Sequence, residues 1–466
     1  MIFTEFRFVA FFLVVFCVHW ALKSNRARKL WLLFASYVFY AAWDWRFLSL
    51  IIASTLLDYF VGLKLEDSDD ERTRKSLIRA SLVGNLGLLG VFKYLNFFID
   101  SGADFLTWLG LPTDPLVLDI ILPVGISFYT FQTLSYSLDI YRKHMPATRN
   151  LFDLAFFVAF FPQLVAGPIV RARDFMPQME TTRRMSWIDI RGCLVLFLVG
   201  FIKKAVISDG IAHYVDEYFD NYEQYSVAST YLGVALWAVQ VYCDFSAYTD
   251  MAIATAGLLG YNLAINFNFP YFSPSVSAFW TRWHISLSFW IRDYVFNSMG
   301  GWTGLNYKGM RNIIVTWILA GLWHGADWRY VVFGLLMVPA LLAQMWWRFS
   351  GLRRKIPLPP LVANAMTMWW ILMCLIYYRA DDMAAAGTIL KSFVLFQAPG
   401  TDLLGDRLGW LLLALTLIHY VNYKGWLQGW WRRLPTMTFT TGYATASALV
   451  LSMVHATAEP FVYFQF

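Results

Sequence analysis

Charged side chains are scarce in this chain. Asp, Glu, Lys and Arg make up only 15% of its 466 residues, whereas hydrophobic residues make up 58% and aromatic residues 19%. A soluble protein carries about 25% charged residues, which cover its surface. The shortage of charge therefore excludes an ordinary soluble fold and predicts a chain with much of its surface in lipid. The net charge of +6 is then explained by basic loops beside a membrane rather than by nucleic-acid binding.

Cysteines are few, and the common catalytic motifs are missing. The four cysteines stand far apart and form no CxxC pair, which argues against a disulfide framework or a cysteine zinc site. The sequence contains no HExxH motif, no GxSxG elbow, no Walker A loop and no GxGxxG loop. None of the seven histidines begins an HxxxxD motif. We therefore expect no metal site, no bound cofactor and no serine-hydrolase mechanism.

Long apolar runs separated by short polar segments dominate what is present. Runs of about 20 apolar residues have the length of a membrane-spanning helix. We predict an all-α, polytopic membrane protein with about ten to twelve transmembrane or re-entrant helices. It is predicted to form a single membrane domain over residues 1–466, with a motif-dense core at about 120–345. The predicted spans are 8–22, 47–65, 78–99, 116–137, 151–170, 187–208, 227–259, 312–322, 328–347, 362–378, 408–423 and 440–455.

Two further apolar stretches do not fit a simple span. Residues 30–43 are too few to cross comfortably, and residues 270–290 begin with two helix-breaking prolines, Pro270 and Pro274. We expect each to be re-entrant or packed inside the bundle. The first 22 residues lack a small-residue cleavage site and are interpreted as an uncleaved first span rather than a signal peptide.

Basic loops predict the orientation in the membrane, because loops rich in Lys and Arg remain cytoplasmic. The segment 209–223 carries four acidic residues after Asp209 and no Lys or Arg, so we expect it on the opposite side. The loops predicted to be cytoplasmic are 23–29, 64–79, 171–191, 348–355 and 424–433.

Polar residues within apolar segments mark candidate functional sites, because placing them in hydrocarbon is costly. Gln240 and Asp244 lie one helical turn apart in the run 227–259, and they therefore share a face. They are candidate substrate-binding residues. A structural role is an equal alternative, because buried carboxylates often pair with basic side chains or cap broken helices.

A second polar group lies in the aromatic segment that follows. It contains Arg282, His284, Arg292 and Asp293. Arg292 and Asp293 interrupt an apolar run, so we expect them to face protein or water. All four are candidate site residues.

His324 follows an apolar segment and is flanked by Gly321 and Gly325, which allow another backbone or a ligand to approach closely. Its neighbour Trp323 is a further substrate-binding candidate. A single histidine on an apolar face is usually a packed core residue. Two in one polar region, His284 and His324, favour catalysis, because histidine is the side chain best suited to proton transfer near neutral pH.

Two other functions fit the same residues. A transporter or flippase could use the intramembrane Asp and His residues to line a polar path or to relay protons. A membrane haem protein could use His284 and His324 as axial ligands. Composition and spacing alone leave these alternatives open.

Longer motifs resemble one known family. The matching stretches are LLFASYVFYAAWD (32–44), LPVGISFYTFQTLSYSLDIYR (122–142), FFPQLVAGPIVRARDFMPQ (160–178), QVYCDFSAYTDMAIATAGLLGYNLAINFNFPY (240–271), FWTRWHISLSFWIRDYVF (279–296), GLWHGADW (321–328) and PFVYFQF (460–466). Taken together and in this order, they resemble the membrane-bound O-acyltransferases (MBOAT), most closely the bacterial branch that acetylates alginate.

The resemblance implies an activity and roles for the candidate residues. It implies many helices around a central tunnel open to both faces of a bacterial inner membrane. A cytoplasmic thioester, acetyl-CoA or an acyl-carrier thioester, would donate an acyl group, most simply acetyl. Hydroxyls of an exported polysaccharide such as alginate, or a periplasmic partner protein, would receive it. His324 would be the general base, and His284, a position that many eukaryotic members fill with Asn or Asp, would orient substrate or stabilise charge. Arg292 and Asp293 would support the histidines, and Arg282 would meet CoA phosphates.

Overall fold

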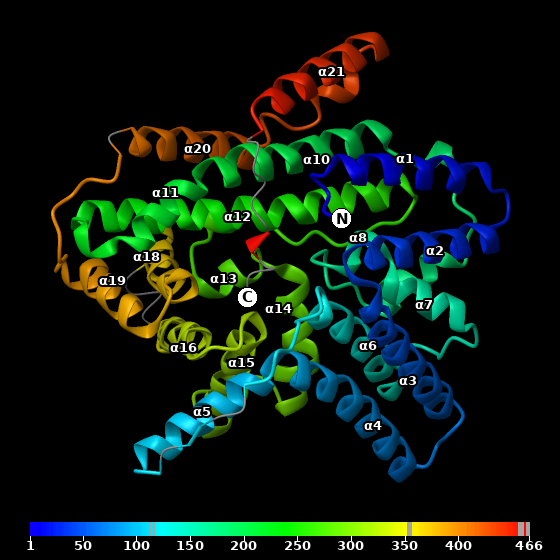
Figure 1. The fold of residues 1–466 in the computed structure, drawn as a ribbon, viewed down its shortest axis with the longest axis horizontal. Helices are drawn as coiled ribbons and strands as arrows, with labels where there is room; N and C mark the ends of the chain where they lie inside the picture. The colour runs from blue at the N-terminus through cyan, green and yellow to red at the C-terminus, as the bar shows by residue number, and fades with distance from the viewer. Residues whose placement is uncertain (112, 115–116, 352–356, 406, 455–460, 463–466) are drawn as a thin grey trace. The chain divides into compact units, whose positions relative to one another are not determined.

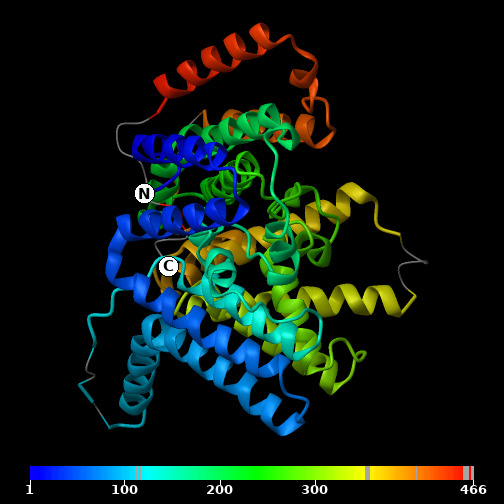
Figure 2. The ribbon, with the colours of Figure 1, turned by 90° about the vertical axis from the view of Figure 1, so that its right-hand side faces the viewer.

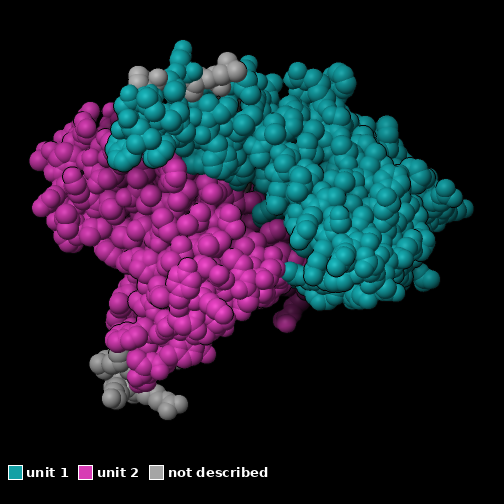
Figure 3. Space-filling model, turned by 90° about the horizontal axis from the view of Figure 1, so that it is seen from below, with its two compact units in different colours: residues 1–193, 252–264 teal, residues 194–251, 265–466 magenta. Residues whose placement is uncertain are grey.

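The computed structural model describes residues 1–111, 113–114, 117–351, 357–405, 407–454 and 461–462. The described residues are mainly helical, and apart from one isolated bridge between Tyr225 and Asp402 they contain no β-structure (Figure 1). They form two compact units, residues 1–193 with 252–264 (unit 1) and residues 194–251 with 265–466 (unit 2), coloured separately in Figure 3. The predicted all-α fold is confirmed, whereas the single membrane domain stays a prediction.

Unit 1 is a group of helices from the first two-fifths of the chain. Helices α3, α4 and α6 pack side by side in it (Figures 1 and 2). Its helices are α1 (Phe6–Ala21), α2 (Asn25–Asp44), α3 (Leu48–Glu66), α4 (Glu71–Leu89), η2 (Gly90–Tyr94), α5 (Leu95–Trp108), α6 (Ile126–Tyr141), α7 (Leu151–Ala159), α8 (Phe161–Leu164) and α9 (Ala172–Phe175).

A buried polar cluster joins these three helices. The Asp58 carboxylate on α3 accepts hydrogen bonds from Asn85 on α4 at 2.7 Å and from Ser137 on α6 at 2.6 Å. Ser81 on α4 donates a third hydrogen bond to the same carboxylate. Because an unsatisfied polar group in an apolar interior is costly, these hydrogen bonds specify how the three helices pack.

Unit 2 contains the longest helix, α12 (Val227–Leu258), whose residues from Ala252 onward belong to unit 1. Its core is built by residues of α11, α12, α16, α18 and α19. Helix α10 (Ile190–Ile202) belongs to unit 2 from Leu194 onward. The other helices of the unit are η5 (Lys203–Ser208), α11 (Asp209–Asp220), α13 (Val276–Trp280), α14 (Ile285–Ile291), η8 (Arg292–Phe296), α15 (Tyr307–His324), α16 (Trp328–Phe349), α18 (Pro360–Arg379), α19 (Met383–Leu395), α20 (Leu408–Tyr423) and α21 (Thr436–Ser452).

Several helices are long and apolar enough to cross a membrane. Among the described residues, four segments meet this criterion by length and composition: Asn25–Glu66, Glu71–Trp108, Trp328–Phe349 and Pro360–Arg379. Three shorter apolar helices add to them, α1, α19 and α20. The chain is therefore a multi-pass membrane protein, and the number of its spans stays a prediction.

Some predicted spans differ from the observed helices. The predicted span 116–137 was wrong over residues 117–125, and its first residue lies outside the described residues. Helix α6 begins only at Ile126, because Gly125 before it adopts φ +78°, outside the helical region. An added Cβ at Gly125 would lie 2.6 Å from the Leu164 carbonyl oxygen, so a residue with a side chain does not fit there. The predicted span 151–170 is interrupted at Phe160, just before Pro162, which has no N–H to continue a helix.

The two doubtful stretches have different outcomes. Residues 30–43 lie within the 20-residue helix α2, which begins at the polar residue Asn25. The segment 270–290 forms a 3₁₀ turn (Pro270–Phe272) and the short helices α13 and α14 in place of one long helix. The end of the last predicted span, His455, lies outside the described residues, as do all but Phe461 and Val462 of the terminal motif.

Candidate active site

His324 is the last residue of α15, and close packing of α15 against α16 determines its position. A Cβ added to Gly321 would collide with the Tyr330 carbonyl of α16, and one added to Gly325 would collide with the Tyr330 ring. Gly334 of α16 makes the reciprocal close approach to the Trp317 carbonyl of α15. The prediction that Gly321 and Gly325 allow a close approach is confirmed, and the approaching group is α16.

His324 is 6% exposed, and its ring lies among aromatic side chains. Its Nδ1 is 3.3 Å from the hydroxyl of Tyr378 on α18. The Phe333 and Tyr378 rings meet it edge-on, at centroid distances of 5.8 and 5.3 Å. A narrow cavity of about 20 Å³ lies beside it. The residues that line this cavity are Val241, Phe279, Trp280, Trp283, His324, Phe333, Met337, Ile371, Leu375 and Tyr378.

His284 precedes α14 in a left-handed backbone conformation, with φ +43° and ψ +55°. Its side chain is fully buried, and the Phe245 ring of α12 meets it edge-on at 4.6 Å. Asn266 holds the turn, since its carbonyl accepts a hydrogen bond from Ile285 N and its Oδ1 accepts from the N–H and hydroxyl of Ser286. A left-handed conformation costs about 1–2 kcal/mol for a residue other than glycine. The surrounding hydrogen bonds therefore have to stabilise it.

Trp323 brings the two histidines into one site. Its ring centroid lies 5.4 Å from that of His284 and 5.1 Å from that of His324. The Trp323 side chain is itself buried. The structure thus places three of the predicted site residues together, although they come from two separate segments of the chain.

Gln240 and Asp244 both lie on α12 and are buried, but they have different surroundings. Gln240 precedes the cavity residue Val241. The Asp244 carboxylate pairs with Lys204 at 2.7 Å and accepts a hydrogen bond from Val462 N at 2.9 Å. Lys204 also pairs with Asp209, at 2.8 Å. Asp244 therefore has the basic partner that is expected if its role is structural. Its role in binding substrate stays a prediction.

The three predicted residues around α14 lie farther toward the surface. Arg292 and Asp293 form an ion pair with each other at 2.7 Å, and the Arg292 side chain is half exposed. Arg282 is partly buried and donates a hydrogen bond to the Phe272 carbonyl at 3.4 Å. The expectation that Arg292 and Asp293 face protein or water agrees with this arrangement. The roles of all three residues at the active site stay predictions.

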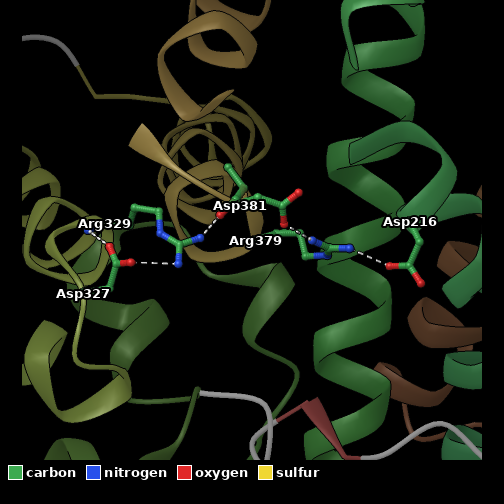
Figure 4. A network of polar contacts seen from close by, with 6 residues as sticks. Asp216, Asp327, Arg329, Arg379 and Asp381 are labelled. Atoms are coloured by element: carbon green, nitrogen blue, oxygen red, sulfur yellow. Dashed lines mark hydrogen bonds and ion pairs between the residues drawn. The ribbon is translucent and has the colours of Figure 1, made fainter. Parts of the chain in front are cut away.

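A network of charged residues lies directly after both His324 and Tyr378 in the chain (Figure 4). Asp327 caps α16 and pairs with Arg329 at 2.9 Å. Burial alone would raise the pKa of the Asp327 carboxyl, but its hydrogen bonds with Arg329 outweigh that effect and hold the pKa below its usual range. Arg329 also donates to the Ala380 carbonyl, and Arg379 pairs with Asp216 of α11 at 2.7 Å and with Asp381 at 3.3 Å.

Comparison with known proteins identifies the family. The model of the membrane-bound O-acyltransferase (MBOAT) family matches residues 141–380. The chain is 38% identical over 429 residues to the probable alginate O-acetylase of Azotobacter vinelandii, a match covering 90% of this chain and 84% of that protein. This protein belongs to the membrane-bound O-acyltransferase family.

Two further relatives of this acyltransferase are similar over most of their lengths. The probable alginate O-acetylase of Pseudomonas aeruginosa is 37% identical, with 91% of this chain and 82% of that protein covered. The peptidoglycan O-acetyltransferase of Helicobacter pylori is 32% identical, with 82% and 77% covered. Family membership makes the chain an O-acyltransferase rather than a transporter.

Sequence reasoning missed two residues of this acyltransferase site. Tyr378 stands 54 residues after His324, and its only sequence signal was its place at the end of an apolar run. Asn266 lies in a quoted family motif, NFNFPY, but its hydrogen bonds to Ile285 and Ser286 are visible only in the structure. Both lie inside the region that the MBOAT model matches.

Proposed function

We propose that this acyltransferase moves an acetyl group across a bacterial inner membrane. The donor is a cytoplasmic thioester, either acetyl-CoA or an acyl-carrier thioester. The acceptor is a hydroxyl of an exported polysaccharide such as alginate, reached directly or through a periplasmic partner protein that completes the transfer. The enzyme needs no bound cofactor in this scheme, because a thioester is already an activated acyl donor.

The observation that carries the proposal is the buried His324 ring at the edge of an apolar cavity. In the proposed reaction, His324 Nε2 takes the proton of the acceptor hydroxyl as its oxygen attacks the thioester carbonyl. The C–O bond of the ester forms, the C–S bond breaks, and the leaving thiolate takes the proton from the His324 imidazolium, which returns to its neutral form. A positioned general base of this kind contributes roughly 10²–10⁴ in rate.

The size and lining of the cavity support a short acyl group. A volume of about 20 Å³ is close to the space that one water molecule needs. A fatty acyl chain would require the surrounding aromatic side chains to move. We assign acetyl because relatives of this chain are named alginate O-acetylase and peptidoglycan O-acetyltransferase.

The other predicted residues take supporting roles in this proposal. His284 orients the substrate or stabilises charge that develops on the thioester carbonyl, as donors do in an oxyanion hole. Trp323 contacts both imidazole rings and helps to fix their positions. Arg282 meets the phosphates of CoA, while Arg292 and Asp293 support the segment that carries His284.

The relatives support the choice of acceptor. Two of them are named for alginate and one for peptidoglycan, and both polymers are polysaccharides located outside the cytoplasm. An enzyme that spans the membrane can take its donor from the cytoplasm and deliver the acyl group on the outer side. This arrangement explains why the catalytic histidine lies within a membrane protein.

The test is to measure ester-linked acetyl groups on exported polysaccharides by NMR before and after mild alkali. A deletion strain is compared with the same strain carrying wild type, His324→Ala or His213→Ala, at matched membrane abundance. His213 is an exposed histidine of α11 and serves as the control. We expect wild type and His213→Ala to restore the esters and His324→Ala to restore less than about 1% of them. Wild-type ester levels in the His324→Ala strain would refute the assignment.

A further inference from the structure

Tyr378 makes a contact with His324 that the proposed mechanism has not yet used. Its hydroxyl lies 3.3 Å from His324 Nδ1, the ring nitrogen opposite the one assigned to the acceptor hydroxyl. The two rings meet at an interplanar angle of 75° and a centroid distance of 5.3 Å. Both side chains are buried, so this contact is shielded from bulk water.

The contact bears on which ring nitrogen of His324 can act as a base. A neutral imidazole carries one proton, and only the unprotonated nitrogen can accept another. If Nε2 is to take a proton from the acceptor hydroxyl, Nδ1 must carry the ring proton and donate it to an acceptor. The Tyr378 hydroxyl oxygen is an acceptor in the required position.

We propose that Tyr378 is a positioning residue for His324. Its oxygen accepts a hydrogen bond from Nδ1–H, which keeps His324 in the tautomer that leaves Nε2 free as the general base and fixes the orientation of the ring. This role rests on the proposed function of His324. Tyr378 does not itself contact the reacting atoms in this proposal.

Packing holds the Tyr378 ring in place from several sides. It contacts the Tyr330 and Phe333 rings of α16 at 5.3 and 5.5 Å, and the Trp237 ring of α12 at 6.3 Å. Because three rings on two helices surround it, the Tyr378 side chain has little freedom to rotate away from His324.

The charged network after both residues fixes their backbones relative to each other (Figure 4). Arg329, which pairs with Asp327 in the segment just after His324, donates a hydrogen bond to Ala380, two residues after Tyr378. Arg379, adjacent to Tyr378, is anchored to Asp216 of α11. The network therefore connects the start of α16, which follows His324 closely in the chain, with the end of α18, which carries Tyr378.

The test uses permeabilised cells of the deletion strain, radiolabelled acetyl-CoA as donor and the strain's own unacetylated polysaccharide as acceptor. Tyr378→Phe keeps the ring and removes the hydroxyl. Tyr377→Phe removes a hydroxyl from the neighbouring buried residue and is the matched control. Initial rates are measured as a function of acetyl-CoA concentration and of pH, at equal membrane abundance of each variant.

We expect Tyr378→Phe to lower kcat about tenfold, as the loss of one hydrogen bond predicts, with KM for acetyl-CoA unchanged. Without the Tyr378 hydroxyl, the Nδ1–H of His324 loses its hydrogen-bond acceptor. This loss destabilises the protonated form of His324 relative to the neutral form, so the acid limb of the pH–rate profile should move to lower pH. The titratable groups His284 and Tyr330 also lie near this pair, and the charged groups Asp327, Arg329 and Arg379 lie beyond them. Neither Tyr378→Phe nor Tyr377→Phe changes any of these five residues. Tyr377→Phe should leave kcat and the pH profile unchanged.

Three results would overturn the role of Tyr378 while leaving the proposed function intact. They are an unchanged kcat in Tyr378→Phe, an acid limb that moves to higher pH, and a raised KM at unchanged kcat. The second would show that Tyr378 donates to Nδ1, and the third that it contacts the donor. A wild-type protein that uses an acyl-carrier thioester but not acetyl-CoA would exclude acetyl-CoA as the donor, and the variants are then compared with the carrier thioester. A wild-type protein that transfers acetyl from neither thioester would overturn the proposed function and the role of Tyr378 with it.

Discussion

At the scale of single residues, backbone conformation as well as side-chain chemistry limits which residue can occupy position 284. His284 is held in the left-handed region of backbone conformation, with φ +43°. Asn, Asp and His are the residues other than glycine that enter this region most readily, whereas β-branched residues enter it rarely. Substitutions at position 284 should therefore separate the backbone requirement from the chemical one.

We predict that His284→Asn and His284→Val fail in different ways. Asn tolerates the left-handed backbone but lacks the imidazole, so His284→Asn should keep its melting temperature in detergent while acetyl transfer falls by at least about tenfold. His284→Val adds strain of about 1–2 kcal/mol and should also lower the melting temperature. Thermal unfolding and the ester assay measure the two effects, and a His284→Val protein as stable as wild type would contradict the strain argument.

His324 and His284 could be proposed as candidates from the sequence, because the motifs around each are local in the chain, and their catalytic roles stay predictions. Partners that are far apart in the chain could not be found in this way. Tyr378 contacts His324 across 54 residues, and Lys204 pairs with Asp244 although the two belong to different helices. Both contacts depend on how the helices pack, which apolar periodicity does not specify.

At the scale of elements, the packing of α15 against α16 positions His324, the candidate catalytic residue. The two helices approach at glycines, Gly321 on α15 and Gly334 on α16, each lying against a carbonyl of the other helix. Small residues at a helix–helix contact allow the backbones to approach closely, and this is a common device in membrane proteins. Any side chain added at these positions has to push the helices apart.

We therefore predict that Gly321→Ala lowers both stability and activity. The added Cβ collides with backbone rather than with a flexible side chain, so α15 must shift and His324 moves with it. Gly387→Ala on α19 is the control, because a Cβ there meets no atom within 4 Å and alanine favours helix by about 1 kcal/mol over glycine. Melting temperature and ester formation should fall in Gly321→Ala and not in Gly387→Ala. Equal behaviour of the two variants would argue against close packing at Gly321.

The helices themselves were predicted well where one apolar run corresponds to one helix. The run 408–423 has the bounds of α20, and the run 227–259 extends one residue beyond α12. The predictions failed where a run continues through a break, as at Gly125 and at Phe160 with Pro162. Hydrophobicity alone does not reveal such breaks, because the residues before and after a break in the helix are equally apolar.

At the scale of the whole molecule, loop charges predict how the chain is oriented in the membrane. The loops 67–70 and 142–150 of unit 1 are joined by the ion pairs Arg149–Asp67 at 2.8 Å and Lys143–Asp69 at 3.5 Å. The first of these loops lies within the basic segment 64–79, which is predicted to be cytoplasmic. The acidic segment 209–223 is predicted to face the other side.

Cysteine labelling can test this orientation. In a variant lacking the four native cysteines, single cysteines are introduced as Arg72→Cys and Glu223→Cys, both at exposed positions. A membrane-impermeant maleimide should label Glu223→Cys in spheroplasts and Arg72→Cys only in inverted vesicles. Labelling of both variants from one side would contradict the predicted orientation.

The division of the chain into units also constrains its biosynthesis. Unit 1 is made of residues 1–193 and 252–264, so residues 194–251, which belong to unit 2, are synthesised before unit 1 is complete. Proteins generally fold domain by domain from the N-terminus as the ribosome delivers them. Here a nascent chain that stops before residue 252 leaves both units unfinished. Unit 1 can therefore be completed only after residues 194–251, which belong to unit 2, have entered the membrane.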